Sequence, residues 1–299
     1  MDATKFNLRR SVFSPGNAIF IVDCLSESEL QTGRTRLQGL HDLLLAKDPE
    51  RFDYNKEFIR RFEASSAAQF ARCFEQITGA CKLGIRPVIF VDAHGHAEKG
   101  LRMPRGDFVG WGALLEELRK VIQRTDGELT VIVAACHSMK AVESLTSLGR
   151  LPFAFYYGYS STVKAYVLNE ETKMIYESLL SDGGATVINA KKLQLKCFSE
   201  YDHVEDVLAF TLLIAKAPAV LAEKVPTFSR NKLRASVDKA TFERGLPLSG
   251  ARSKVNRMLN SGDICIQFVQ QMMHATPRRK RVIEDIQAYI QDLPAHPIP

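Results

Sequence analysis

The chain has 299 residues, which at roughly 150 residues per domain allows one large domain or two small ones. Hydrophobic side chains make up 45% of it and charged ones 25%, a composition that excludes a disordered or collagen-like chain. No apolar run reaches the roughly 18–20 residues of a membrane span. The net charge of +6 is spread along the chain and forms no concentrated basic stripe. We therefore expect neither a membrane nor a nucleic acid as a partner.

The cysteines indicate a reducing compartment. Six of them lie at positions 24, 73, 81, 136, 197 and 265, and none forms a CxxC pair, which excludes a zinc ribbon and a thioredoxin motif. The two N-terminal arginines are followed by no apolar export segment. Scattered thiols without an export signal are typical of a cytoplasmic protein.

Strands and helices are predicted to alternate along residues 15–190. Short continuous apolar runs predict strands that are buried on both faces, as in a parallel sheet, at 18–23, at 86–95 with a turn at its end, and at 129–135. Weaker patterns predict two more strands, at 52–62 and 152–157. Apolar residues at helical spacing predict helices at 36–46, 65–83, 112–124 and 163–181, and a hairpin or loop is expected at 100–111. This alternation predicts the α/β class, a three-layer α/β/α sandwich, with a first domain at 1–190.

The remainder, 191–299, is predicted to be a mainly helical C-terminal extension. An apolar helix near 204–223 precedes a basic, polar stretch at 228–260, and a last helix is expected near 279–292. Five residues from Pro277 to Arg281 open that helix with a basic cluster, which we interpret as a solvated face or a partner contact. The extension is expected to regulate the first domain or to recruit an activating protein partner.

Two predicted strands end in residues that can carry out chemistry. One ends in His94-Gly95 and the next ends at Cys136. Because function gathers at the carboxyl ends of parallel strands, the two side chains are expected to emerge side by side. A thiol beside an imidazole is the minimum set for acyl transfer, since the imidazole takes the thiol proton and later protonates the leaving amine. The pattern predicts Cys136 as nucleophile and His94 as general base and acid, with no cofactor.

An oxyanion hole is expected beside these two residues. The tetrahedral intermediate needs donors about 3 Å from its oxyanion. The backbone N–H groups of Gly95 and Cys136 are the candidates, and glycine at position 95 lets the chain approach a substrate without a Cβ in the way.

Other interpretations of the same residues stay open. Cys136 also fits a buried structural cysteine, and His96 and His137 are alternative bases. Asp92, at the end of its strand, is expected to cap or orient a group near the cleft. The histidines and the cysteine lack the CxxC or HxxxH spacing of a metal site, so we expect no metal.

The two motifs IFVDAHG and VIVAACHS, in this order, resemble those of the caspase-like cysteine peptidases, which include caspases, metacaspases and CHAT-type proteases. The histidine precedes the cysteine by 42 positions here and by about 50 in caspases. The segment IFIVDCLSESELQTGRTRLQGLHDLL is also similar to the first strand, loop and helix of a caspase. The resemblance covers about 15–190 and implies a caspase-like (caspase-hemoglobinase) fold.

The sequence departs from the family at positions that set specificity. Caspases have Gln-Ala-Cys where this chain has Ala-Ala-Cys, and metacaspases place an aspartate where Ala134 stands, so the metacaspase basis for cleavage after arginine or lysine is missing. Arg34 and Arg36 lie in a segment similar to one that supplies a substrate-binding arginine in caspases, which hints at an acidic P1 residue. Tyr157 and Tyr159 follow the fifth strand, where they either shape the substrate groove or pack in the core.

The resemblance implies a cysteine endopeptidase that acts on protein or peptide substrates, and the compact bacterial members suggest the proteolytic effector of a defence or cell-death system. A catalytically silent caspase-like scaffold that binds protein partners is the alternative. A flavodoxin- or Rossmann-like domain is a weaker one, because Val-Asp-Cys-Leu-Ser-Glu after the first strand is no glycine-rich phosphate loop.

Overall fold

The computed structural model describes residues 13–145, 150–181, 193–206 and 276–292, together with positions 208, 235, 266, 267, 269, 270 and 273. The chain divides into two compact units. One unit comprises Arg9–Ser147 and Leu151–Glu200, and the other comprises Tyr201–Pro299 with Met1–Leu8 and Leu148–Arg150. Each unit is described by itself.

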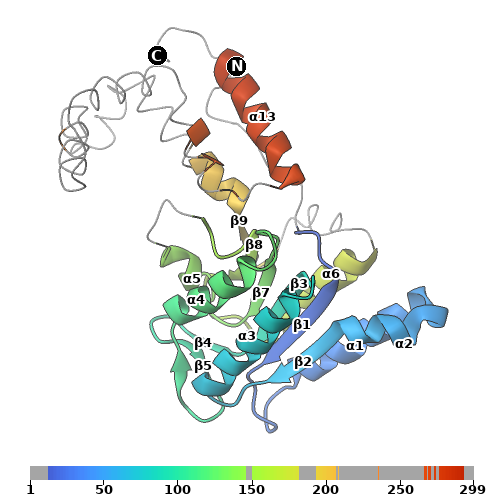
Figure 1. The fold of residues 1–299 in the computed structure, drawn as a ribbon. Coiled ribbons are helices and arrows are strands. Elements are labelled where there is room, and N and C mark those ends of the chain that lie inside the picture. The colour runs from blue at the N-terminus through green and yellow to red at the C-terminus, as the bar shows by residue number, and fades with distance from the viewer. Residues whose placement is uncertain are drawn as a thin grey trace. The chain divides into compact units, whose positions relative to one another are not determined.

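A six-stranded sheet forms the centre of the first unit (Figure 1). Its strands, in spatial order, are β2 (Ile59–Glu63), β1 (Ala18–Asp23), β3 (Pro87–Asp92), β7 (Thr130–Ala134), β8 (Phe155–Tyr159) and β9 (Leu195–Ser199). The first five are parallel, and β9 runs antiparallel to β8. The prediction of a mostly parallel α/β sheet is confirmed.

The strands with continuous apolar runs lie in the middle of this sheet. Every residue of β1, β3 and β7 is buried, because helices cover both faces and leave no solvent-facing side. Successive side chains of a strand point to opposite faces, so each of these strands contributes to two apolar layers.

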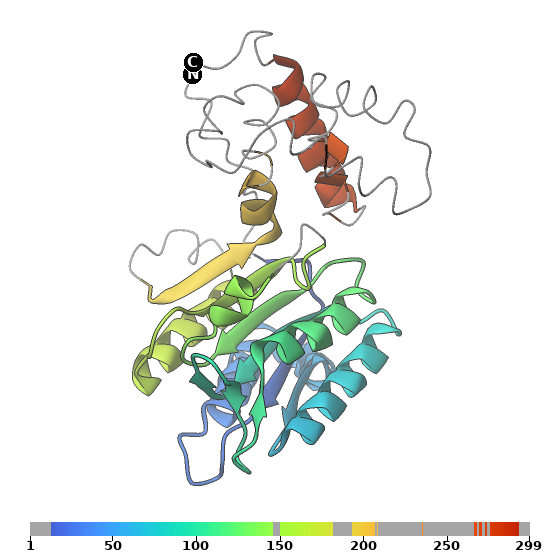
Figure 2. The same cartoon turned by 90° about the vertical axis from the view of Figure 1, so that its left-hand side faces the viewer.

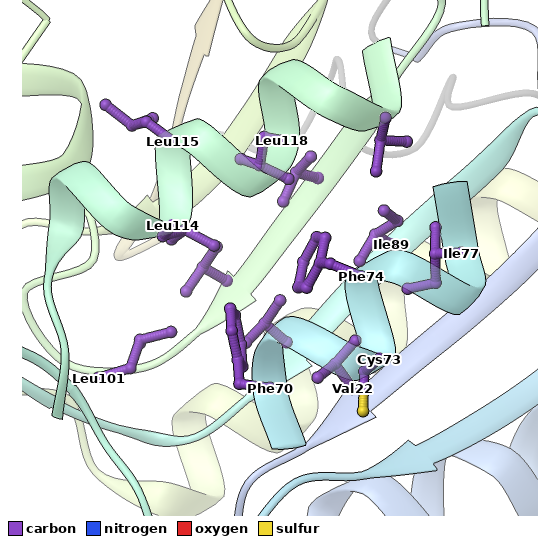
Figure 3. Packing of buried hydrophobic residues seen from close by; sticks show 14 of the residues in the cluster. Val22, Phe70, Cys73, Phe74, Ile77, Ile89, Leu101, Leu114, Leu115 and Leu118 are labelled. Atoms are coloured by element: carbon purple, nitrogen blue, oxygen red, sulfur yellow. The ribbon is translucent and has the colours of Figure 1, made fainter. Parts of the chain in front are cut away.

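Helices α3 (Ala67–Cys81) and α4 (Trp111–Ile122) cover one face of the sheet. Figure 3 shows Phe74 of α3 and Leu114 and Leu118 of α4 in one cluster with Ile89 of β3. Ser66 caps α3 by accepting a hydrogen bond from the Gln69 N–H at 3.3 Å.

Helices α1 (Thr32–Lys47) and α6 (Ala165–Ser181) cover the opposite face, so that helices flank the sheet on both sides (Figure 2). The guanidinium of Arg36 on α1 lies 4.6 Å from the ring centre of Phe90 on β3. Gly39 lets α1 and α6 approach closely, because an added Cβ would lie 2.5 Å from the Tyr176 hydroxyl. The predicted three-layer α/β/α arrangement is therefore present.

Three local features differ from the sequence-based prediction. The strand expected at 52–62 begins only at Ile59, after the short helix α2 (Phe52–Asn55) and flanking 3-10 turns. The hairpin or loop expected at 100–111, by contrast, is confirmed: β5 (Gly100–Arg102) and β6 (Phe108–Val109) form an antiparallel hairpin, which makes a small sheet with β4 (His94–His96). A short helix, α5 (Lys140–Glu143), follows β7, and β9 was not predicted at all.

The second unit contains the long helix α13 (Pro277–Asp292), which covers the helix predicted at 279–292. Most of the helix expected at 204–223, and the stretch 228–260 apart from position 235, lie outside the described residues. Among the helices in the described ranges, none has the length and apolar character to cross a membrane.

Candidate functional site

The candidate site lies at the carboxyl ends of the neighbouring strands β3 and β7. These strands are parallel and in register, with Asp92 beside Ala134. The backbone contact continues one residue further, where the Ala93 N–H donates to the Ala134 carbonyl at 3.4 Å. The segments that carry His94 and Cys136 therefore leave the sheet together at the same edge, as the sequence predicts.

Gly95 brings the two segments into direct contact. A Cβ added to Gly95 would lie only 1.7 Å from the Cys136 carbonyl oxygen and 3.0 Å from the Cys136 nitrogen. No side chain fits into that space, so glycine is required there for a steric reason. The backbone beside His94 is thus packed against the backbone of the candidate nucleophile.

Cys136 is partly exposed, and its thiol lies beside the loop that follows β8. Its Sγ accepts a hydrogen bond from the Val163 N–H at 3.3 Å and donates to the Val163 carbonyl at 3.6 Å. Among the hydrogen bonds of the described residues, none joins this thiol to His94, and none has the Cys136 N–H as donor. No hydrogen bond within the described residues thus competes with the oxyanion role that the sequence predicts for this N–H.

A tight turn presents Cys136. His137 has a φ of 58°, a left-handed conformation that is uncommon outside glycine. The buried Ser138 hydroxyl donates to the Val133 carbonyl at 3.0 Å and accepts from the Tyr159 N–H at 2.9 Å. The Tyr156 hydroxyl donates to the Ser138 carbonyl at 2.9 Å. Hydrogen bonds to β7 and β8 thus fix the turn to the sheet.

His94 is exposed, and within the described part of the chain its ring contacts one side chain. Its Nε2 lies 2.9 Å from Oε1 of Glu29, in the loop between β1 and α1. Sequence reasoning missed Glu29, because nothing in a polar loop of 24–31 singles out one carboxylate. Only the fold shows that this loop reaches the end of β3.

The two alternative bases are engaged elsewhere. Nδ1 of His96 accepts the N–H groups of Glu98 and Lys99, each at 3.2 Å. Nε2 of His137 lies 3.2 Å from the Thr162 hydroxyl. Among the described contacts, no histidine ring touches the Cys136 thiol. His94 remains the candidate base because its neighbour Gly95 packs directly against Cys136.

Asp92 is fully buried and anchors the surrounding elements. Its carboxylate accepts from Arg36 at 2.6 and 3.2 Å and from the Thr32 hydroxyl at 2.8 Å. Its backbone carbonyl accepts the Cys24 N–H at 2.8 Å. Asp92 therefore joins the end of β1, the end of β3 and the start of α1. Arg36 is only 1% exposed, so in this structure its guanidinium serves Asp92 and is closed to a substrate.

Arg34 remains accessible, beside a hollow of about 300 Å³ at the carboxyl ends of β1 and β2. Its guanidinium lies 3.9 Å from both Glu27 and Glu63. Asp23 and Arg61 also line this hollow, and they form an ion pair at 2.8 Å. Burial raises the pKa of the Asp23 carboxyl, although the hydrogen bond from Arg61 acts in the opposite direction.

The other three substrate-binding candidates are buried. Ala134 is the last residue of β7 and is buried within the sheet. The ring of Tyr157 packs against Phe13, with ring centres 5.7 Å apart. The Tyr159 phenol is also buried, and burial together with the nearby Glu171 raises its pKa. In this structure these side chains are buried and contribute to the core.

Residues suited to a metal ion do not cluster in the described part of the chain, where no group of three or more histidine, cysteine, aspartate or glutamate side chains converges. Acyl transfer through a thiol and an imidazole needs no further group. Comparisons with models of known protein families and with curated proteins find no match to this chain.

Proposed function

We propose that the chain is a cysteine endopeptidase of caspase-like fold, with Cys136 as nucleophile and His94 as general base and acid. One observation carries the proposal. Gly95 packs so closely on Cys136 that no side chain fits between them, which keeps the histidine and cysteine segments at one edge of the sheet. An accessible thiol, an accessible imidazole and an unused backbone N–H lie at this edge.

The reaction follows from these groups. His94 accepts the proton of the Cys136 thiol, and the sulfur attacks the peptide carbonyl carbon. The C–N bond then breaks, the leaving amine takes the proton from the imidazolium, and a thioester remains on Cys136. Water, deprotonated by His94, hydrolyses the thioester, which releases the acid product and restores the thiol. The Cys136 N–H, with that of Gly95, stabilises the oxyanion in both steps.

The substrates are proposed to be proteins or peptides. Arg34 and Arg36 lie in the segment that resembles the one with the substrate-binding arginine of caspases. Of the two, only Arg34 is exposed, so it is the remaining candidate to contact an acidic P1 side chain of the substrate. A role as the effector of a bacterial defence or cell-death system, and activation through a partner bound to the C-terminal extension, are further proposals that rest on the sequence resemblance alone.

One observation favours the silent scaffold instead. Both hydrogen bonds of the Cys136 thiol are made with Val163, so in this conformation the thiol proton is not shared with His94. Catalysis requires the thiol to rotate, or the loop that carries Val163 to shift, before proton transfer.

The deciding experiment combines a peptide library with a thiol-reactive acyloxymethyl ketone, in the presence and absence of Ca²⁺. We expect the wild-type protein to cleave and to be labelled at position 136, and Cys136→Ala to lose at least about 10³-fold in rate. Cys197→Ala is the matched control, because Cys197 is the other partly exposed cysteine of the described residues. A wild-type protein that is neither labelled nor active supports the scaffold.

A further inference from the structure

The Glu29 carboxylate contacts the candidate base from outside the two predicted motifs. Its Oε1 lies 2.9 Å from Nε2 of His94. The His94 side chain is 53% exposed and that of Glu29 is 35% exposed. An ion pair between freely moving surface side chains contributes little free energy. The contact can hold the imidazole in place only if the loop itself fixes the carboxylate.

The loop does fix it. The second carboxylate oxygen of Glu29, Oε2, accepts the Ser26 N–H at 2.8 Å, and the Glu29 N–H donates to the Ser26 carbonyl at 3.0 Å. The Gln31 side chain donates to the Ser26 carbonyl at 2.6 Å and to the Glu29 carbonyl at 3.1 Å. Each carboxylate oxygen thus has a partner. Oε1 contacts His94, and Oε2 is held by the backbone of the loop.

Both ends of the loop are anchored to the residue that ends β3. Asp92 accepts the Cys24 N–H just before the loop, and it accepts the hydroxyl of Thr32 just after it. Arg36, one turn further along α1, pairs with the same carboxylate. Because His94 follows Asp92 closely in the chain, one buried residue sets the distance between the Glu29 loop and the histidine.

We propose that Glu29 is a positioning residue for His94. A carboxylate at Nε2 holds the proton on that nitrogen, which leaves Nδ1 with a free lone pair to accept the thiol proton. The same carboxylate stabilises the imidazolium once the proton has moved. Glu29 itself stays ionised throughout and exchanges no proton. This inference rests on the proposed function.

The charge state of Glu29 agrees with this role. Burial acts to raise the pKa of the carboxyl, but the hydrogen bonds from Ser26 and His94 outweigh it and lower the pKa below its usual range. The carboxyl group is therefore ionised at neutral pH.

The test replaces the carboxylate by its neutral isostere. Glu29→Gln is expected to lower kcat at least about tenfold, with little change in KM, because a positioning residue acts through His94 on the chemical step. The ¹⁵N shifts of the His94 imidazole report the tautomer directly, and we expect the Nε2–H form to dominate in the wild type and to lose its dominance in Glu29→Gln. Glu98→Gln removes the same charge from an exposed side chain on the His94 hairpin, and it is expected to leave both readouts unchanged.

The outcomes separate this proposal from the proposed function. A wild-type protein that cleaves peptides, together with a Glu29→Gln variant of equal kcat and unchanged His94 shifts, overturns the role of Glu29 and leaves the peptidase standing. A wild-type protein that is neither active nor labelled at Cys136 overturns both. A similar loss of kcat in Glu98→Gln would show a general charge effect and would also overturn the role of Glu29.

Discussion

The two sides of the candidate site are built in different ways. The Cys136 side is a tight turn. Ser138, two residues after Cys136, is buried in this turn and hydrogen-bonded to β7 and β8. The His94 side is exposed, and its side chain is held through a loop that comes from β1. The candidate nucleophile thus depends on the core that underlies its turn, whereas the candidate base depends on contacts between segments far apart in the sequence.

This difference separates the residues that support each side. Asp92 and Arg36 support the loop of Glu29, and Ser138 and Tyr156 support the turn of Cys136. Gly95 is the point at which the two sides touch. Substitutions at these three places should therefore produce three distinct patterns of stability, thiol reactivity and histidine tautomer.

The largest effect is expected for Asp92→Ala. The change leaves the Arg36 guanidinium buried without its counter-charge, which costs about 3–5 kcal/mol in the free energy of unfolding. Urea denaturation measures the loss, and ¹⁵N shifts should show that His94 has lost its fixed tautomer. Arg86→Gln breaks an exposed pair with Asp126 and should cost below about 1 kcal/mol. Equal losses in the two variants would show that the buried pair does not anchor the loop.

Gly95→Ala tests the contact between the two sides. The added methyl group overlaps the Cys136 carbonyl, so the backbone must shift, and a displacement of about 1 Å at a reacting centre costs on the order of 100-fold in rate. The rates of peptide cleavage and of Cys136 labelling measure this loss. Gly112→Ala is the matched control, because its added Cβ meets nothing within 4 Å. A Gly95→Ala protein with wild-type rates would contradict the close packing.

The sequence predicts most of the sheet and the placement of the candidate residues His94 and Cys136 for the same physical reason. Strands buried on both faces need continuous apolar runs, as in β1, β3 and β7, and parallel strands put their final residues at one edge. Strand β9 escapes prediction because an edge strand with an exposed lysine, Lys196, needs no such run.

The partners that the fold alone determines are harder to predict. Arg36 reads as a surface arginine on a polar helix, and only the pairing of α1 with the end of β3 buries it against Asp92. The sequence predicts a strand that ends at 157, whereas β8 continues to Tyr159 and buries both Tyr157 and Tyr159. Contacts across 56 or 65 positions, such as Arg36 with Asp92 and Glu29 with His94, leave no local pattern.

The smallest effect is expected for Ser138→Ala, on the nucleophile side. The change removes the acceptor of the buried Tyr159 N–H and should cost about 1–3 kcal/mol in the free energy of unfolding. Because the hydroxyl supports only the turn, Cys136 labelling should slow while the His94 tautomer stays as in the wild type. Ser144→Ala, which removes an exposed hydroxyl bonded to the Ala141 carbonyl, is the control. If Ser138→Ala disturbs the histidine as much as the thiol, the two sides are one rigid body, and the separation between a core-held nucleophile and a loop-held base is wrong.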